Sequence, residues 1–203
     1  MTEHKDDWFR KPRLTQQEIE RFEQKLKRTR SSRHEYMRIQ AYSLENAGQF
    51  SRTLELIDRI QTEEPDHYSL TLLYALKANC FRKMGNIDSA IHWYRASLQR
   101  EKDRPSVIGT TSTEFPFWVA TERLEQLYDE AHAILLETID PRHLFPMTSF
   151  KQYAALALIT AEMGYIEDAK SSARAALLYA ERTKSNAANH RNLGLVGNAH
   201  GDL

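Results

Sequence analysis

The residues of this chain whose types could carry catalysis or hold a ligand are eight histidines, one cysteine and a few glycines near the C-terminus. The histidines include no His-Glu-x-x-His motif and no pair four residues apart on one predicted helix, so no metal site is expected. Gly194, Gly197 and Gly201 lack the spacing of a phosphate-binding loop and follow no predicted strand. Cys80 lies within a predicted helix, which favours a packed thiol over a nucleophile. The sequence therefore predicts neither an enzyme nor a bound metal or cofactor.

The most strongly charged stretch is KLKRTRSSR, whose basic residues are Lys25, Lys27, Arg28, Arg30 and Arg33. Three interpretations remain open. The stretch is a solvated helix end, where positive charge suits the helix dipole, or it contacts a protein, or it neutralises phosphates of a nucleic acid. By contrast, the segment from Glu114 to Asp140 is acidic, and the two segments could attract each other between molecules.

The composition favours an all-α protein that works inside the cell. The 203 residues carry 28 basic and 28 acidic side chains, so the chain as a whole does not attract nucleic acids or membranes. Gly and Pro are scarce, at 7 and 6 residues, whereas a β-rich fold of this size needs more turn residues. The N-terminus has no apolar signal segment and the chain has no apolar run of membrane-spanning length, so we expect a cytoplasmic protein without a membrane partner.

Hydrophobic spacing predicts about seven to eight helices and no strand. Capping-box spacing at Thr15/Glu18 and again at Ser32/Glu35 predicts two helix starts. The stretch 103–116 is rich in Pro, Gly, Ser and Thr and is interpreted as a loop, followed by one long helix over 117–139. We expect an irregular arm at 1–14, one helical domain at 15–184 and a tail at 185–203. Whether the apolar tail residues dock in cis or in trans is left open; they are Leu193, Leu195 and Val196.

Three glycines at predicted helix ends indicate a repeat of two-helix units. Gly48, Gly85 and Gly164 each follow a small residue by seven positions and precede another small residue by five. The preceding residues are Ala41, Ala78 and Ala157, and the following ones are Thr53, Ala90 and Ala169. Small side chains allow two helices of a hairpin to pack closely, so these positions have a steric reason. Repeated hairpins at this period are typical of a helical solenoid.

The middle unit resembles the tetratricopeptide repeat. It matches that family's pattern at Tyr74, Ala78, Phe81, Ala90 and Tyr94, and departs from it at Lys77, where Leu is usual, and at Lys102, where Pro is usual. The outer two units are degenerate, and an irregular unit lies between the second and the third. The resemblance covers roughly residues 36–182 and implies an α-solenoid of antiparallel helix hairpins.

The resemblance also implies a concave groove that binds another protein or peptide, as in an adaptor, scaffold or regulatory subunit. The residues that fall on its first helices are Arg38, Tyr42, Asn79, Arg82 and Lys83. Arg38 and Asn79 match two slots of the carboxylate clamp found in some members, but the other slots hold Tyr42, Ala154 and Leu158, so a complete clamp is absent. The alternative is a nucleic-acid-associated regulator that uses the basic segment 25–33.

Overall fold

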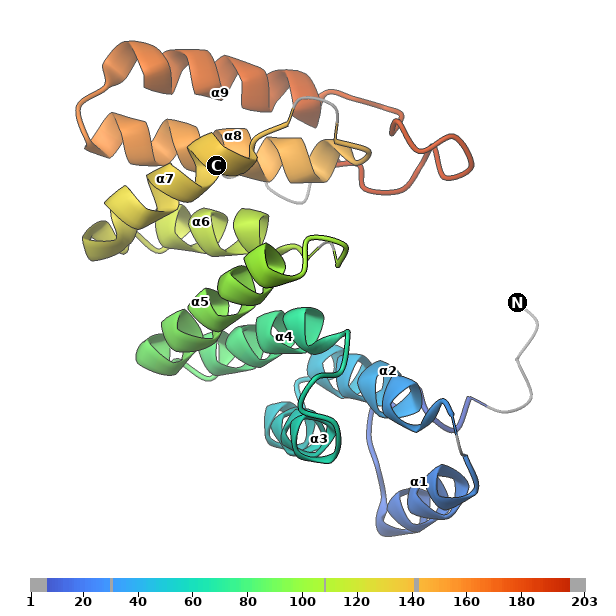
Figure 1. Ribbon diagram of the computed structural model, residues 1–203. Coiled ribbons are helices and arrows are strands. Elements are labelled where there is room, and N and C mark those ends of the chain that lie inside the picture. Colours follow the sequence, from blue (N-terminus) through green and yellow to red (C-terminus); the bar gives the residue numbers. More distant parts are fainter. Residues whose placement is uncertain (1–6, 30, 108, 141–142, 198–203) are drawn as a thin grey trace. The chain divides into compact units, whose positions relative to one another are not determined.

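The computed structural model describes residues 7–29, 31–107, 109–140 and 143–197, and over these residues it is all-α, as predicted (Figure 1). This described part contains nine α-helices and one 3-10 helix and no strand. The helices are α1 Gln16–Arg28, α2 Arg33–Asn46, α3 Phe50–Glu63, α4 Leu70–Lys83, α5 Ile87–Asp103, α6 Thr111–Thr121, η1 Glu125–Leu127, α7 Tyr128–Thr138, α8 Pro146–Glu162 and α9 Ile166–Ala180. None of these helices is long and apolar enough to cross a bilayer.

The chain divides into two compact units, Met1–Gly109 and Thr110–Leu203. In the first unit, each of α2, α3 and α4 packs on the helix that follows it, and α2 also contacts α4. In the second unit, α6 packs on α7 and α8, α7 packs on α8, and α8 packs on α9 as an antiparallel neighbour (Figure 1). The single helical domain predicted over 15–184 remains a prediction.

The start of α1 confirms the first predicted capping box. Thr15 Oγ1 accepts a hydrogen bond from the Glu18 amide at 3.3 Å, and the Glu18 carboxylate accepts one from the Thr15 amide at 2.9 Å. The second box does not form, although Ser32 is the N-cap of α2. The Glu35 carboxylate accepts hydrogen bonds from Arg38 instead, so it does not reach back to the Ser32 amide.

The three predicted turn glycines all adopt the left-handed conformation, with φ of 74° at Gly48, 77° at Gly85 and 86° at Gly164. At each turn, the glycine amide donates to the carbonyl three residues back, and the next amide donates to the carbonyl five residues before it, as Gln49 does to Leu44. These paired bonds satisfy the last carbonyls of the preceding helix. The glycines therefore end α2, α4 and α8.

A fourth turn of the same kind lies at Arg123, which sequence reasoning missed. Arg123 has φ of 52°, its amide donates to Ala120 O at 3.3 Å, and the Leu124 amide donates to Val119 O at 3.0 Å. This residue is the one non-glycine of the described chain with a positive φ. Because the usual glycine signal is missing, the turn is invisible to a search for glycines. The four turn residues are spaced 37, 38 and 41 positions apart along the chain.

This turn corrects two expectations for the segment before it. The predicted long helix over 117–139 is broken at residues 122–124, and the predicted loop over 103–116 contains the start of α6 at Thr111, with Pro116 inside that helix. Phe115, Trp118 and Val119 are almost fully buried. Their burial stabilises α6 by more than the proline costs, so tertiary packing overrides the local Pro and Thr signals here.

We expect Arg123→Gly to stabilise the protein by about 0.5–1 kcal/mol, because the left-handed conformation costs a side-chain-bearing residue more than it costs glycine. Urea unfolding followed by circular dichroism measures the change. The matched control is Arg174→Gly, an exposed position inside α9, which should destabilise by about 1 kcal/mol. Destabilisation by Arg123→Gly would contradict this account of the turn.

The described residues of the N-terminal arm pack against α1 and α2. The Trp8 ring lies 5.5 Å from Phe22 and 4.9 Å from Tyr36, measured between ring centroids, and Phe9 lies 4.6 Å from Tyr36. The side chain of Gln40 on α2 is fully buried, and both of its polar atoms pair with the backbone of Lys11, at 3.0 and 2.6 Å. Trp8 and Phe9 thereby pack against the core cluster to which α1, α2, α3 and α4 all contribute.

The described part of the tail docks in cis on α8. The Met147 amide donates to Gly194 O at 2.8 Å, and the Asn186 amide donates to Leu144 O at 2.9 Å. Val196 is 4% exposed and lines an apolar cavity of about 360 Å³ with Phe150, whereas Leu193 is 57% exposed and Leu195 is half-buried. Of the three apolar tail residues, Val196 therefore makes the buried contact.

Candidate functional site

The five predicted groove residues lie on two helices of the first unit that contact each other. Arg38 and Tyr42 lie on α2, and Asn79, Arg82 and Lys83 lie on α4. Two polar contacts connect these helices near both ends. Tyr68, just before α4, donates its hydroxyl to Glu35 Oε2 at 3.1 Å, and Lys83 Nζ donates to Glu45 Oε1 at 2.6 Å. Because Glu35 and Glu45 lie near the start and the end of α2, the two helices run in the same direction.

Arg38 is held on its own helix by Glu35. Its Nε donates to Glu35 Oε2 at 2.9 Å, and its guanidinium lies 5.7 Å from the Tyr42 ring centroid. The hydrogen bonds from Arg38 lower the pKa of the Glu35 carboxyl, and burial raises the pKa of the Tyr42 phenol. The Arg38–Glu35 pair is therefore ionised near neutral pH. The Arg38 guanidinium also lies beside the aromatic ring of Tyr42.

The side chain of Asn79 on α4 is oriented by a hydrogen bond from α5, the second helix of its hairpin. The buried Tyr94 hydroxyl on α5 donates to Asn79 Oδ1 at 2.6 Å. This contact uses the amide oxygen of Asn79 and leaves the amide nitrogen as a donor, for which no partner is found in the described part of the chain. Asn79 is half-buried, so a ligand on this face can reach that nitrogen.

Arg82 and Lys83 differ in how they are engaged. Lys83 is exposed and pairs with Glu45, whose carboxylate is almost buried. The Arg82 side chain is half-buried and forms no hydrogen bond or ion pair with any residue that the structure describes. Arg82 is therefore the cation of this set that is available to a partner without breaking an existing pair.

The predicted basic segment does not form one uniform positive surface. Arg33 donates to both carboxylate oxygens of Glu63, at 2.9 and 3.0 Å, and Lys25 lies 5.4 Å from the Trp8 ring centroid. Lys27 and Arg28 are exposed at the end of α1, and Arg30 lies outside the described residues. Since Glu63 neutralises Arg33, the segment offers fewer unpaired cations to phosphates than its sequence suggests.

Two further residues are accounted for by packing. Lys77 is buried, pairs with Asp58 and lies 3.8 Å from the Trp93 ring centroid. Burial raises the pKa of the Cys80 thiol to about 12, and the side chain is fully inaccessible. A thiol of this kind stays protonated at neutral pH, so Cys80 is not suited to act as a nucleophile.

A cluster that the sequence did not predict lies where α2 begins and the α3–α4 connection passes. His34, Glu64 and His67 each bring one potential ligand atom into a group in which all three atoms lie within 4.8 Å of one another. Burial lowers the pKa of the His67 imidazole, and Arg33 with Arg59 and His34 lowers the pKa of the neighbouring Glu63 carboxyl to about 2. The Glu64-Pro-Asp-His67 spacing was visible in the sequence, but His34 joins it only through the fold.

Comparison of the chain with protein-family models, with curated proteins and with solved structures finds no match.

Proposed function

We propose that this protein is a tetratricopeptide-like interaction module that binds a segment of another protein on the face formed by α2 and α4. The observation that carries the proposal is the pairing of these two helices, which run in the same direction. We propose that Arg38, Tyr42, Asn79 and Arg82 line the face that the two helices form. In a solenoid of helix hairpins, the first helices of successive units line the inner face. The cytoplasm, where a regulatory subunit or adaptor of this kind meets its partners, is the proposed location.

The spacing of the four left-handed turns supports the solenoid part of the proposal. Intervals of 37, 38 and 41 residues divide the chain into units of similar length, each with one turn between two helices. The unit that looked irregular in the sequence is then one more hairpin, α6 with α7, in which Arg123 replaces the turn glycine. Ala41 and Ala78, in the small-residue slots, are fully buried, and Pro116 holds the same slot before Arg123.

The chemistry of the face favours a partner that carries an acidic group beside an apolar or aromatic side chain. Arg82 supplies a cation without an internal partner among the described residues, and the Asn79 amide supplies a donor. A carboxylate would receive charge-assisted hydrogen bonds from this pair. Tyr42, beside Arg38, would supply contact area at low entropic cost.

Selection from a random peptide library on the full-length protein tests the proposal. We expect acidic peptides to be enriched, and we expect Arg82→Ala to weaken a selected peptide about tenfold, because a hydrogen bond to a charged group is lost. Fluorescence anisotropy measures the dissociation constants. The matched control is Arg174→Ala, an exposed arginine on α9 that should leave binding unchanged.

If wild type, Arg82→Ala and Tyr42→Ala bind the selected peptide with equal affinity, the α2–α4 face is not the binding site. The alternative, nucleic-acid binding by the segment 25–33, makes a different prediction. RNA or DNA would then bind with an affinity that falls steeply as salt rises, and Lys27→Ala with Arg28→Ala would reduce it.

A further inference from the structure

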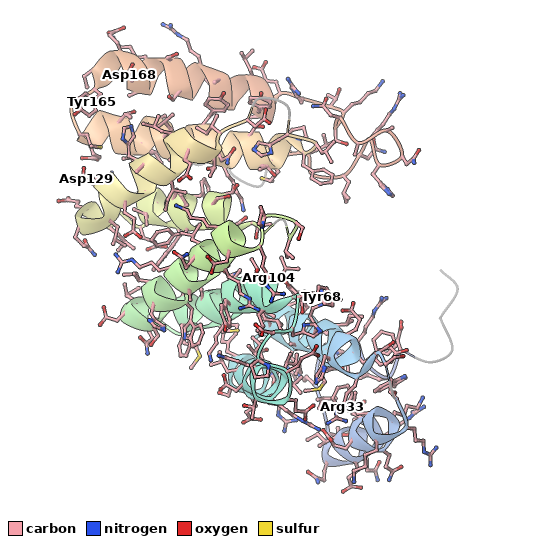
Figure 2. All side chains as sticks on the ribbon, in the orientation of Figure 1. Arg33, Tyr68, Arg104, Asp129, Tyr165 and Asp168 are labelled. Atoms are coloured by element: carbon pink, nitrogen blue, oxygen red, sulfur yellow. The ribbon has the colours of Figure 1, made fainter. Side chains whose placement is uncertain are left out.

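The cluster of His34, Glu64 and His67 has the composition of a transition-metal site. Two imidazoles and one carboxylate are a common set of protein ligands for Zn²⁺, and they leave a fourth position for water or another ligand. The three side chains come from the first turn of α2, the C-cap of α3 and the connection to α4. Figure 2 labels Arg33 and Tyr68, the sequence neighbours of His34 and His67.

His34 is oriented by two carboxylates in a way that suits a metal ligand. Its Nε2 lies 3.1 Å from Glu63 Oε2, and its Nδ1 lies 2.7 Å from Glu64 Oε2. A neutral imidazole has only one N–H, so it cannot donate to both carboxylates. When Nε2–H donates to Glu63, the lone pair of Nδ1 faces the Glu64 oxygen at 2.7 Å, and these two atoms must move apart to about 3.3 Å to hold one tetrahedral Zn²⁺ ion.

Glu63 is itself fixed in the outer shell of this arrangement. Arg33 donates to both of its oxygens, and Arg59 Nε donates to Oε1 at 2.8 Å. Metal-binding histidines usually donate their second N–H to a carboxylate, which fixes the tautomer and the ring orientation. The hydrogen bonds that join Arg33 to Glu63 and Glu63 to His34 have this form.

His67 provides the buried side of the cluster. It is 5% exposed, and its Nδ1 lies 2.6 Å from Ser69 Oγ. The Ser69 amide donates to the same Nδ1 at 3.2 Å, so Nδ1 is an acceptor and the neutral ring carries its hydrogen on Nε2. To bind a metal through Nε2, the ring must change tautomer, so that Nδ1–H donates to Ser69 Oγ and the contact with the Ser69 amide is lost. The His34 and His67 ring centroids are 5.6 Å apart.

The distances require only a modest movement on binding. Ligand atoms around a tetrahedral Zn²⁺ ion lie about 3.3 Å apart, given metal–ligand distances of about 2.0–2.2 Å. The three candidate atoms lie within 4.8 Å of one another before any ion is present. The Glu64 side chain is half exposed, so it has the freedom to move inward.

We propose that His34, Glu64 and His67 bind a divalent transition-metal ion of the Zn²⁺ class, which cross-links the start of α2 to the α3–α4 connection. This inference is independent of the proposed peptide-binding function. It also concerns the same helices, because Glu35, next to His34, and Tyr68, next to His67, form the contact that ties α2 to the start of α4. Metal binding would therefore stabilise the relative position of α2 and α4 in the first unit.

Titration of the EDTA-treated, dialysed full-length protein with Zn²⁺ and with Co²⁺ tests the proposal. Calorimetry should give a one-to-one stoichiometry with Zn²⁺, and Co²⁺ should develop visible d–d absorption that Zn²⁺ abolishes. Glu64→Gln, His34→Gln and His67→Gln should each weaken Zn²⁺ binding at least tenfold. Glu64→Gln is the decisive variant because its exposed side chain can be replaced without disturbing the core.

The matched control is His92→Gln, which removes an exposed histidine of α5 and should leave the Zn²⁺ affinity unchanged. Melting temperatures measured in EDTA establish that each variant is folded. Absence of Zn²⁺ binding by the wild type would overturn the proposal. Equal Zn²⁺ affinities of wild type, Glu64→Gln and His34→Gln would also overturn it. A third contradicting result would be an NMR spectrum in which His34 is an imidazolium cation that added Zn²⁺ does not change.

Discussion

Replacing Tyr94 by alanine should destabilise the first unit by about 3–5 kcal/mol, the largest effect we expect from a single substitution in this chain. The Tyr94 ring is fully buried on α5, where it packs against α4. Its removal leaves a cavity the size of an aromatic ring in the centre of the α4–α5 hairpin. A cost of this size approaches the whole stability of many small domains.

The conservative variant Tyr94→Phe separates packing from hydrogen bonding. It keeps the ring but removes the hydroxyl that donates to Asn79 Oδ1, so we expect a loss of only about 1 kcal/mol. Urea unfolding gives the free energies, and hydrogen exchange of α4 and α5 reports the affected hairpin directly. Because the Tyr94 phenol also orients Asn79, Tyr94→Phe should weaken the binding of a peptide that contacts the Asn79 amide, while the fold stays intact.

The control for Tyr94→Ala is Tyr165→Ala, which truncates a tyrosine that is 52% exposed at the start of α9. This change should cost less than about 0.5 kcal/mol, as is usual for surface positions. Comparable losses in the two variants would mean that Tyr94 is not the central packing residue of its hairpin.

The second large effect is expected at Gln40, whose side chain fastens the N-terminal arm. Gln40→Ala removes both hydrogen bonds to the Lys11 backbone and leaves space in the core, so we expect a loss of about 2–3 kcal/mol. The arm should also detach, because Trp8 and Phe9 are only half-buried and depend on this anchor. Hydrogen exchange of residues 7–13 should accelerate at least tenfold.

A matched control is Gln61→Ala on α3, a half-buried glutamine with no hydrogen-bond partner among the residues that the structure describes. It should leave exchange in the arm unchanged. Complete exchange of residues 7–13 within seconds in the wild type would mean that the arm is not docked in solution, which would remove the basis of this prediction.

Several parts of the fold could be predicted because their signals are local. The capping box at Thr15 and Glu18 forms as expected, and Gly48, Gly85 and Gly164 take the left-handed conformation that ends each helix. These features depend on a few neighbouring residues, whose steric and hydrogen-bonding preferences are visible in the sequence. The all-α class follows equally from the scarcity of turn residues and from the helical spacing of the apolar side chains.

Other parts could not be predicted because a sequence pattern does not show which of several partners a side chain binds, or how deeply a segment is buried. Ser32 and Glu35 have the spacing of a capping box, but Arg38 binds the Glu35 carboxylate. The α6–α7 turn was missed because Arg123 gives no local sign of a left-handed conformation. Nothing in the segment 103–116 indicated that burial of Phe115 and Trp118 would extend a helix through Pro116.

The same distinction between local and distant contacts applies to the candidate sites. Outside the segment 103–139, the sequence alone determined which helices form, where three of their turns lie, and which polar residues fall on α2 and α4, because each of these depends on periodicity and nearby residues. Only the tertiary structure decided that Arg33 is neutralised by Glu63 and that His34 meets Glu64 and His67, because these partners lie about thirty residues apart. The physical reason is that side-chain pairing depends on how helices pack, whereas helix formation and termination depend mainly on local contacts.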